Sequence, residues 1–150
     1  MEDINFSFDR ALELLKVSEL LYSNKYYADS INRSYYAVFY ATKALLLKKG
    51  IDTNKHSGLI HQFGLAYIIN DNFNKNTGKI LSRLEEDRVH ADYDMSIPTT
   101  KEKAEKDLYN AKIFIKECKK FYDQLSISLL NYTVKYRASQ IYKNLAIHTF

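Results

Sequence analysis

The chain has 150 residues, of which 46% are hydrophobic and 27% charged, as expected for one folded globular domain. It contains only four glycines and one proline, whereas these two types together usually make up about 12% of a protein. Tight turns are therefore scarce, which disfavours β-sandwiches and barrels. The single cysteine, Cys118, excludes an internal disulfide and a Cys-x-x-Cys site.

The net charge of +4 is concentrated at the C-terminal end of the chain. Residues 131–150 contain Lys135, Arg137 and Lys143 and no acid, so they carry +3, and the first 130 residues carry +1. Strong binding to a polyanion needs clustered basic side chains on the body of a protein. Charge alone therefore does not predict such binding here.

The longest stretch without a charged residue runs over residues 56–70 and includes histidines, a glutamine and an asparagine. It is too short and too polar to span a bilayer. The first residues lack the basic and apolar regions of a secretory signal. We therefore expect a cytoplasmic protein that does not cross a membrane.

Apolar residues recur at steps of three and four along most of the chain, which predicts amphipathic helices. The expected helices span about residues 7–22, 28–48, 53–70, 77–91 and 99–125. Thr77 is the expected start of the fourth, and a capping box of Thr99 and Glu102 is expected to start the fifth. The sequence thus predicts an all-α, up-and-down bundle of about five helices.

The expected domain boundary lies near residue 130, with a helical bundle over residues 1–130 and a C-terminal extension over 131–150. The extension gives two conflicting signals. Tyr132, Val134 and Tyr136 alternate with polar residues, as in a strand, whereas Ile141 and Leu145 have helical spacing. Its structure is left open at this point.

Arg88 is the main candidate for a functional residue. Helical spacing places it on the same face as Leu81, Leu84 and Ala91, which should point inward. A guanidinium at such a position either forms a structural pair with Asp92, one turn later, or binds a phosphate through its paired N–H groups. Both interpretations remain open from the sequence.

Four further side chains are candidates near Arg88. His90 has a pKa suited to proton transfer but lies on a face that should be solvated, and Tyr93 follows the expected end of the helix. Arg33 lies beside the apolar stripe of the second helix and is either a surface residue over aromatic rings or part of the same groove. His56, near the start of the third helix, is either a capping or core residue or a phosphate contact.

Other residue types predict packing rather than chemistry. Most of the 13 tyrosines have helical spacing, so core and interface packing is favoured over stacking on bases. Cys118 is expected in the core. The chain has neither a Walker-type phosphate loop nor a recognisable set of metal ligands, so we expect no metal and no cofactor.

Three motifs in this order resemble the HEPN family. They are DSINRSYYAVFYA at residues 29–41, followed by Ala44-Leu45-Leu46; KHSG at residues 55–58, with Phe63; and RVHADYD at residues 88–94. The resemblance covers about residues 7–123 and is closest to short stand-alone prokaryotic members that are often encoded beside a minimal nucleotidyltransferase.

The resemblance implies an all-α bundle, a homodimer and a groove where the two copies meet. Many HEPN proteins resemble metal-independent endoribonucleases that use the Arg and His of an Arg-x4-6-His motif, and others resemble nucleotide-binding or toxin partners controlled by a nucleotidyltransferase. Arg88 matches the motif arginine, but the position five residues later is Tyr93. Arg83 and His90 fit the longer spacing, although helical spacing places them away from Arg88.

The resulting hypothesis is a homodimeric HEPN protein that binds RNA or a nucleotide in a groove near the dimer interface and acts with a nucleotidyltransferase in a toxin–antitoxin system. The expected ligand-binding residues are Arg88, Asp92, Tyr93, Arg33 and His56. One alternative is a metal-independent endoribonuclease toxin, in which Arg88, His90 and Tyr93 would be catalytic. Another is a non-catalytic structural adaptor.

Overall fold

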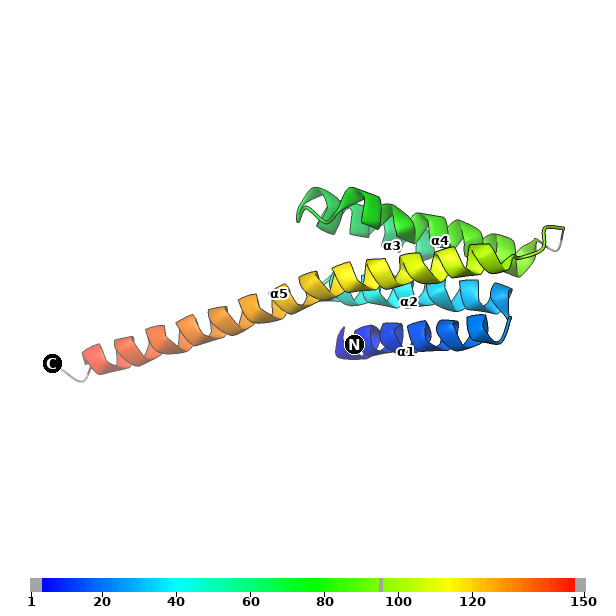
Figure 1. Cartoon of the computed structure of the whole chain (residues 1–150). Helices are drawn as coiled ribbons and strands as arrows, with labels where there is room; N and C mark the ends of the chain where they lie inside the picture. Colours follow the sequence, from blue (N-terminus) through cyan, green and yellow to red (C-terminus); the bar gives the residue numbers. More distant parts are fainter. Residues whose placement is uncertain (1–3, 95, 148–150) are drawn as a thin grey trace.

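The computed structural model describes residues 4–94 and 96–147, with the side chains of all these residues except 125–131, 133 and 147. Within these ranges the chain forms helices and no strands. In order they are α1 (Ile4–Ser23), α2 (Tyr27–Lys48), α3 (His56–Phe63), the π-helix η1 (Gly64–Ile69), α4 (Lys75–Tyr93) and α5 (Lys101–Ile147). The predicted all-α bundle is confirmed (Figure 1).

Helix α2 lies at the centre of the bundle, between α1 on one side and α3 and α4 on the other, with the first half of α5 packed against it (Figure 1). Its residues explain this position, because apolar or small side chains occur on nearly every face. Ile31, Tyr35, Val38 and Leu45 are completely buried, and so is Ala41 between them. A helix that is apolar on most sides is stable only when it is surrounded by other helices.

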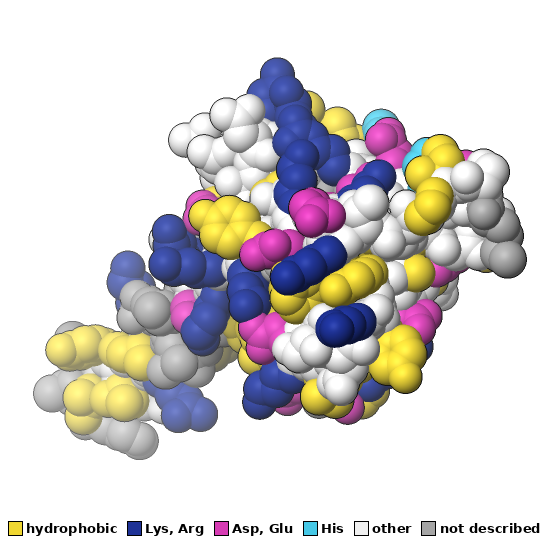
Figure 2. Space-filling view, turned by 45° about the vertical axis from the view of Figure 1, so that its right-hand side comes forward, with side chains coloured by type: hydrophobic (Ala, Val, Ile, Leu, Met, Phe, Trp, Pro, Cys, Tyr) yellow, Lys and Arg dark blue, Asp and Glu magenta, His cyan; other side chains and the backbone are white. Residues whose placement is uncertain are grey.

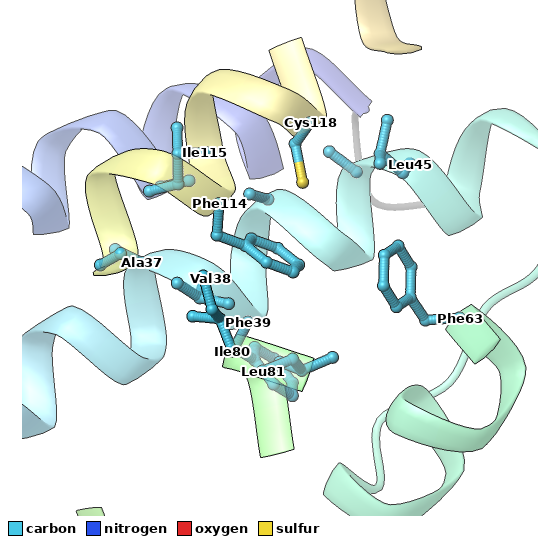
Figure 3. Close-up of a cluster of buried hydrophobic side chains, with 14 of the residues drawn as sticks. Ala37, Val38, Phe39, Leu45, Phe63, Ile80, Leu81, Phe114, Ile115 and Cys118 are labelled. Carbon is cyan, nitrogen blue, oxygen red and sulfur yellow. The ribbon is translucent and has the colours of Figure 1, made fainter. Parts of the chain in front are cut away.

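The core is rich in aromatic rings contributed by several helices. Phe63 of α3 packs 5.0 Å from Phe73 and 5.7 Å from Phe114 of α5, measured between ring centroids. Phe114 and Cys118 extend from α5 toward α2 and α3 (Figure 3). Cys118 is completely buried, as its spacing predicts, and burial raises the pKa of its thiol. The cysteine is thus a packing residue.

The helix ends are set by capping side chains at different residues from those expected. The Asn74 side chain accepts a hydrogen bond of 3.0 Å from the backbone of Thr77, so α4 begins before Thr77. The Thr100 hydroxyl accepts one of 3.2 Å from the backbone of Lys103. The predicted cap at Thr99 is therefore wrong by one residue.

The third predicted helix contains a change in helical type. The α-helix gives way at Gly64 to six residues of π-helix, in which the backbone hydrogen bonds span five residues instead of four. Lys49 secures this segment, because its ammonium bonds to the carbonyl of Ala66 at 2.6 Å and to the carboxylate of Asp71 at 2.6 Å, and lies over the Tyr67 ring. The Tyr67 hydroxyl also donates a hydrogen bond to the carbonyl of Leu45.

The second half of α5 leaves the bundle as a single helix (Figure 1). Before this point Tyr122 contacts α1, because it stacks on Phe8 at 4.5 Å between ring centroids and hydrogen-bonds to Asn5. We call residues 124–147 the C-terminal extension. The strand-like alternation at residues 132–137 is misleading, because these residues continue α5; residues 148–150 lie outside the described part.

No helix within the described part of the chain is both long enough and apolar enough to cross a membrane.

Candidate functional site around Arg88

Arg88 lies on the inward face of α4, one turn after the buried Leu84, and is only 9% exposed. The sequence predicts this inward position, because residues three and four apart on a helix share a face and Leu81 and Leu84 on this face are apolar. The position is unusual for a cation, because Arg is seldom buried unless it is paired. The surroundings of its guanidinium therefore matter.

Two aromatic rings of α2 flank this guanidinium. Its central carbon lies 5.1 Å from the ring centroid of Tyr35 and 5.7 Å from that of Tyr36. These distances allow cation–π attraction, which is strengthened where water is excluded. The two rings therefore help to hold the cation in place.

The nearest anion is shared with another residue. An Nη atom of Arg88 lies 3.7 Å from Oδ2 of Asp92, longer than a hydrogen bond, and the same oxygen accepts a hydrogen bond of 2.9 Å from the Asn32 amide. The buried Nε of Arg88 has no hydrogen-bond partner among the described residues. The guanidinium is thus incompletely satisfied, which suits it to bind an additional anion.

His56 joins the same aromatic cluster from the start of α3. Its Nδ1 shares a hydrogen bond with the Tyr35 hydroxyl, and its ring centroid lies 5.6 Å from that of Tyr35 and 6.0 Å from that of Tyr36. Burial and the Glu85 carboxylate raise the pKa of Tyr35, and Arg88 partly offsets this. Tyr35 therefore stays protonated. Its hydroxyl bonds to His56 and its ring lies under the Arg88 guanidinium, so it links these two residues.

The other predicted site residues lie apart from this cluster. Tyr93 is the last residue of α4 and is 75% exposed. The His90 side chain is also exposed and lies 3.8 Å from Asp94. Arg33 is exposed on α2. Within this chain, the structure thus brings together Arg88, Asp92 and His56 but does not bring His90, Tyr93 or Arg33 to them.

Sequence reasoning missed Asn32, Tyr35 and Tyr36 as members of the site. They lie on α2, whereas Arg88 and Asp92 lie on α4, so only the packing of the two helices unites them. A signal was present, because Asn32 precedes Tyr35 and Tyr36 by three and four residues and so shares a helical face with them.

A second buried charge cluster lies between α4 and α5. Asp107 is only 2% exposed, and burial and the neighbouring Asp87 raise its pKa to about 8. Lys103 forms an ion pair of 3.1 Å with Asp87. Burial and a neighbouring carboxylate both favour the protonated form of such a group. No group of three or more potential metal ligands occurs among the described residues.

Comparison with known proteins identifies the family. The model of the HEPN domain matches residues 4–121. The protein named Putative toxin MJ0605 of Methanocaldococcus jannaschii is 38% identical over 119 residues, which cover 79% of this chain and 88% of that protein. Putative toxin MJ0142 of the same organism is 35% identical over 113 residues, covering 75% of this chain and 77% of that protein.

A UPF0332 protein of Thermotoga maritima is 34% identical over 116 residues, covering 77% of this chain and 88% of that protein. The family match includes Arg88 and its cluster and stops at residue 121, where α5 begins to leave the bundle. The fold, the match over most of the chain and these relatives agree, and the chain belongs to the HEPN domain family.

Proposed function

We propose that this protein is a toxin-like HEPN protein that binds RNA or a nucleotide through Arg88, in a groove near the interface of a homodimer. The observation that carries the proposal is the buried guanidinium, whose Nε has no partner among the described residues and whose Nη lies 3.7 Å from the Asp92 carboxylate. A phosphate oxygen would supply the missing acceptor, and Arg binds phosphate in a bidentate manner. The names of two relatives support the toxin-like part of the proposal.

The residues of the cluster have distinct roles in this proposal. Arg88 binds the phosphate, and Tyr35 and Tyr36 hold the guanidinium of Arg88 in place. Asp92 and Asn32 keep the guanidinium from turning away, since the Asn32 amide fixes the carboxylate. His56 lies on the same two rings and is placed to contact the ligand or to position Tyr35. Tyr93, His90 and Arg33 reach the ligand only if the ligand or a second copy extends over their exposed positions.

A binding experiment tests the proposal. Fluorescent single-stranded RNA is titrated with purified protein in EDTA, with ATP as a competitor. The Arg88→Ala variant should bind RNA at least about tenfold more weakly, equivalent to about 1.4 kcal/mol. Arg83→Ala, which removes an exposed cation from the same helix, is the matched control and should change affinity little. Equal affinities of all three proteins would contradict the proposal.

The alternative function is metal-independent cleavage of RNA. Arg88 would then stabilise the charge that develops on the phosphate, and His90 or Tyr93 would transfer protons. We include His56, expected from the sequence as a ligand contact, as a further candidate, because its ring packs on the same tyrosine pair as Arg88. Cyclic-phosphate ends that form in EDTA and disappear in Arg88→Ala would favour this function. Binding without cleavage would favour the first.

The proposed partner is a nucleotidyltransferase that controls this activity. Co-expression with a nucleotidyltransferase encoded beside this chain, followed by purification of the pair, tests this part separately. A protein that neither binds nor cuts RNA would instead be a structural adaptor, in which Arg88 only holds α4 to α2.

A further inference from the structure

Burial determines the direction of the hydrogen bond between Tyr35 and His56. The Tyr35 side chain is completely buried, and within the described part of the chain its hydroxyl is bonded only to Nδ1 of His56. Burial and the Glu85 carboxylate raise the pKa of this hydroxyl, so it carries its proton at neutral pH. A buried hydroxyl proton needs an acceptor, and an imidazole nitrogen accepts only through a lone pair. Tyr35 is therefore the donor of this bond, and Nδ1 is the acceptor.

This direction determines which nitrogen of the His56 ring carries a proton. A neutral imidazole has one N–H group and one lone pair, so a lone pair at Nδ1 leaves the proton on Nε2. With the proton on Nδ1, the ring would donate to the tyrosine oxygen, and the buried hydroxyl would lose the acceptor for its own proton. Nε2 is thus a hydrogen-bond donor, and it has no partner among the residues that the structure describes.

His56 also lies at the positive end of a helix. It is the first residue of α3, and the side chain of Lys55 before it makes no capping hydrogen bond. The first turn of α3 contains no acidic residue. Unpaired backbone N–H groups at the start of a helix attract anions. The Nε2 donor and the helix end therefore favour the same kind of ligand.

Arg88 and His56 contact the same tyrosine from different sides. The guanidinium lies over the Tyr35 ring, whereas the imidazole lies at the hydroxyl end of that ring, with 5.6 Å between the ring centroids. Both groups also flank the Tyr36 ring, whose centroid is 5.7 Å from the guanidinium carbon and 6.0 Å from the imidazole centroid. Arg88 is buried, but His56 is only half-buried. An anion bound to Arg88 beside this tyrosine pair would therefore lie next to His56.

The visible surface of the bundle offers a phosphate little general attraction. On the face that Figure 2 shows, basic and acidic side chains are interspersed over the body of the molecule, and residues 1–130 together carry a net charge of +1. Sequence-independent attraction to phosphate needs clustered basic side chains. A phosphate bound to the bundle would therefore depend on donors that touch it directly.

We propose that His56 donates a hydrogen bond from Nε2 to the phosphate that Arg88 binds, and that Tyr35 is the positioning residue that holds the imidazole in this tautomer. The identity of the ligand, a phosphate of RNA or of a nucleotide, rests on the proposed function, whereas the tautomer does not. The same geometry restricts His56 in the alternative function. A nitrogen that already carries a proton has no lone pair with which to accept one, so His56 would orient the phosphate rather than act as the base.

The tautomer is tested without a ligand, by NMR of the ¹⁵N-labelled full-length chain at about pH 9, well above the ordinary pKa of histidine. Protonated and unprotonated ring nitrogens give separate signals, and His56→Gln identifies those of His56 among the four histidines. We expect the unprotonated nitrogen to be Nδ1 and its signal to move in Tyr35→Phe, which keeps the ring beside Arg88 and removes the hydroxyl. Tyr36→Phe, which removes the hydroxyl of the other ring, is the matched control and should leave the signal in place. A proton on Nδ1, or an identical signal in wild type and Tyr35→Phe, would overturn the proposal.

Two substitutions at His56 test the contact with phosphate. Glutamine places an amide N–H near the position of Nε2, whereas asparagine is too short to reach it. His56→Asn should bind fluorescent single-stranded RNA about tenfold more weakly than the wild type, and His56→Gln should keep more of the affinity. The same pair is measured with ATP, so that a difference seen with RNA alone assigns a phosphodiester and one seen with ATP assigns a nucleotide. Equal affinities of the two variants for both ligands would contradict the contact.

Failure of the His56 contact is distinguishable from failure of the proposed function. Arg88→Ala that binds RNA as tightly as the wild type would disprove phosphate binding at this site, whatever the tautomer. Weaker binding by Arg88→Ala, together with equal binding by His56→Asn and His56→Gln, would disprove only the role of His56. Circular dichroism checks that each variant is folded. If Tyr35→Phe does not fold, the assignment of Nδ1 in the wild type and the two His56 variants still decide the outcome.

Discussion

Arg88 is buried, and its Nε has no acceptor among the residues that the structure describes, an arrangement that reduces the stability of a fold. The Asp92 carboxylate beside it is already bonded to Asn32, and the two flanking tyrosine rings attract the cation without neutralising its charge. Unsatisfied polar groups of this kind are common where a ligand completes the set. The residue thus has a cost in the free protein that a bound anion would remove.

This interpretation gives a stability prediction for Arg88→Met. Methionine has a similar length and makes favourable contacts with aromatic rings, so it fills the space over Tyr35 and Tyr36 without a charge. We expect the free energy of unfolding in urea to stay within about 1 kcal/mol of the wild-type value or to rise, because apolar replacement of an incompletely paired buried ion is often neutral or stabilising. A loss above about 3 kcal/mol would instead make the Arg88–Asp92 pair structural.

Asp107 gives a pH prediction. Its pKa, raised by burial and by Asp87 to about 8, means that the folded protein retains a proton there which the unfolded chain releases near pH 4. Stability should therefore fall as the pH rises from about 4 to about 8, because the folded state binds more protons across this range. Lys103 and Lys106, on the same helix, limit the effect.

Asp107→Asn should remove this dependence, since an amide does not ionise. The measurement is the urea midpoint of unfolding at pH 5, 6.5 and 8, with Asp9→Asn, which changes an exposed carboxylate, as the control. The slope should persist in Asp9→Asn and be flatter in Asp107→Asn. Identical slopes in all three proteins would mean that Asp107 ionises normally in the folded state.

At the scale of elements, helix ends depend on single backbone conformations. Gly50 follows α2 with φ of +73°, and no atom lies within 4 Å of a Cβ added there, so any effect of substitution comes from the backbone. Gly64 lies at the junction of α3 and η1 with helical φ and ψ of −56° and −46°, and a Cβ there also meets open space. The two glycines therefore form a matched pair with opposite expectations.

Gly50→Ala should lower the free energy of unfolding by about 1 kcal/mol, because a left-handed conformation disfavours a side chain. Gly64→Ala should raise it by about 0.4–1 kcal/mol, because alanine restricts the unfolded chain and suits a helix. Thermal or urea unfolding of both variants measures the difference. Changes of the same sign would show that side-chain packing, not backbone conformation, decides at one of the two positions.

The contact between α1 and α2 is another feature of the elements. Ser18, Ser30 and Ser34 are completely buried, and their hydroxyl groups hydrogen-bond to one another and to backbone carbonyls across the two helices. Small side chains permit a close approach, and the hydrogen bonds satisfy the polar atoms that this approach buries. Helical periodicity alone does not reveal such a contact, because serine contributes no hydrophobic signal.

At the scale of the whole molecule, the extension is a helix with few contacts inside its own chain. Isolated helices of this length are marginally stable in water, so we expect the extension to open more readily than the bundle. In hydrogen exchange, its amides should therefore exchange faster than those of the bundle part of α5. Equal protection of the two halves of this helix would contradict the prediction.

Much of this molecule follows from periodicity. The bundle and the inward position of Arg88 are visible in the spacing of apolar residues, because a helix buries one face. The spacing does not reveal the exact caps at Asn74 and Thr100, because several neighbouring polar residues can cap a helix. The meeting of Asn32 and Tyr35 with Arg88 depends on how α2 and α4 pack, which local spacing does not encode.

The π-helix decouples chain length from the orientation of the site. Because η1 accommodates an additional residue, deleting one position within 64–69 would allow ordinary α-helical hydrogen bonding to resume. The wide turn already absorbs the extra residue, so such a deletion would leave α3 and the residues after η1 close to their present relative orientation. His56 should then keep its hydrogen bond to Tyr35, and the change would fall on η1 itself, where Lys49 bonds to the Ala66 carbonyl. The irregularity of the chain therefore bears on how Lys49 anchors this segment, not on where the imidazole lies.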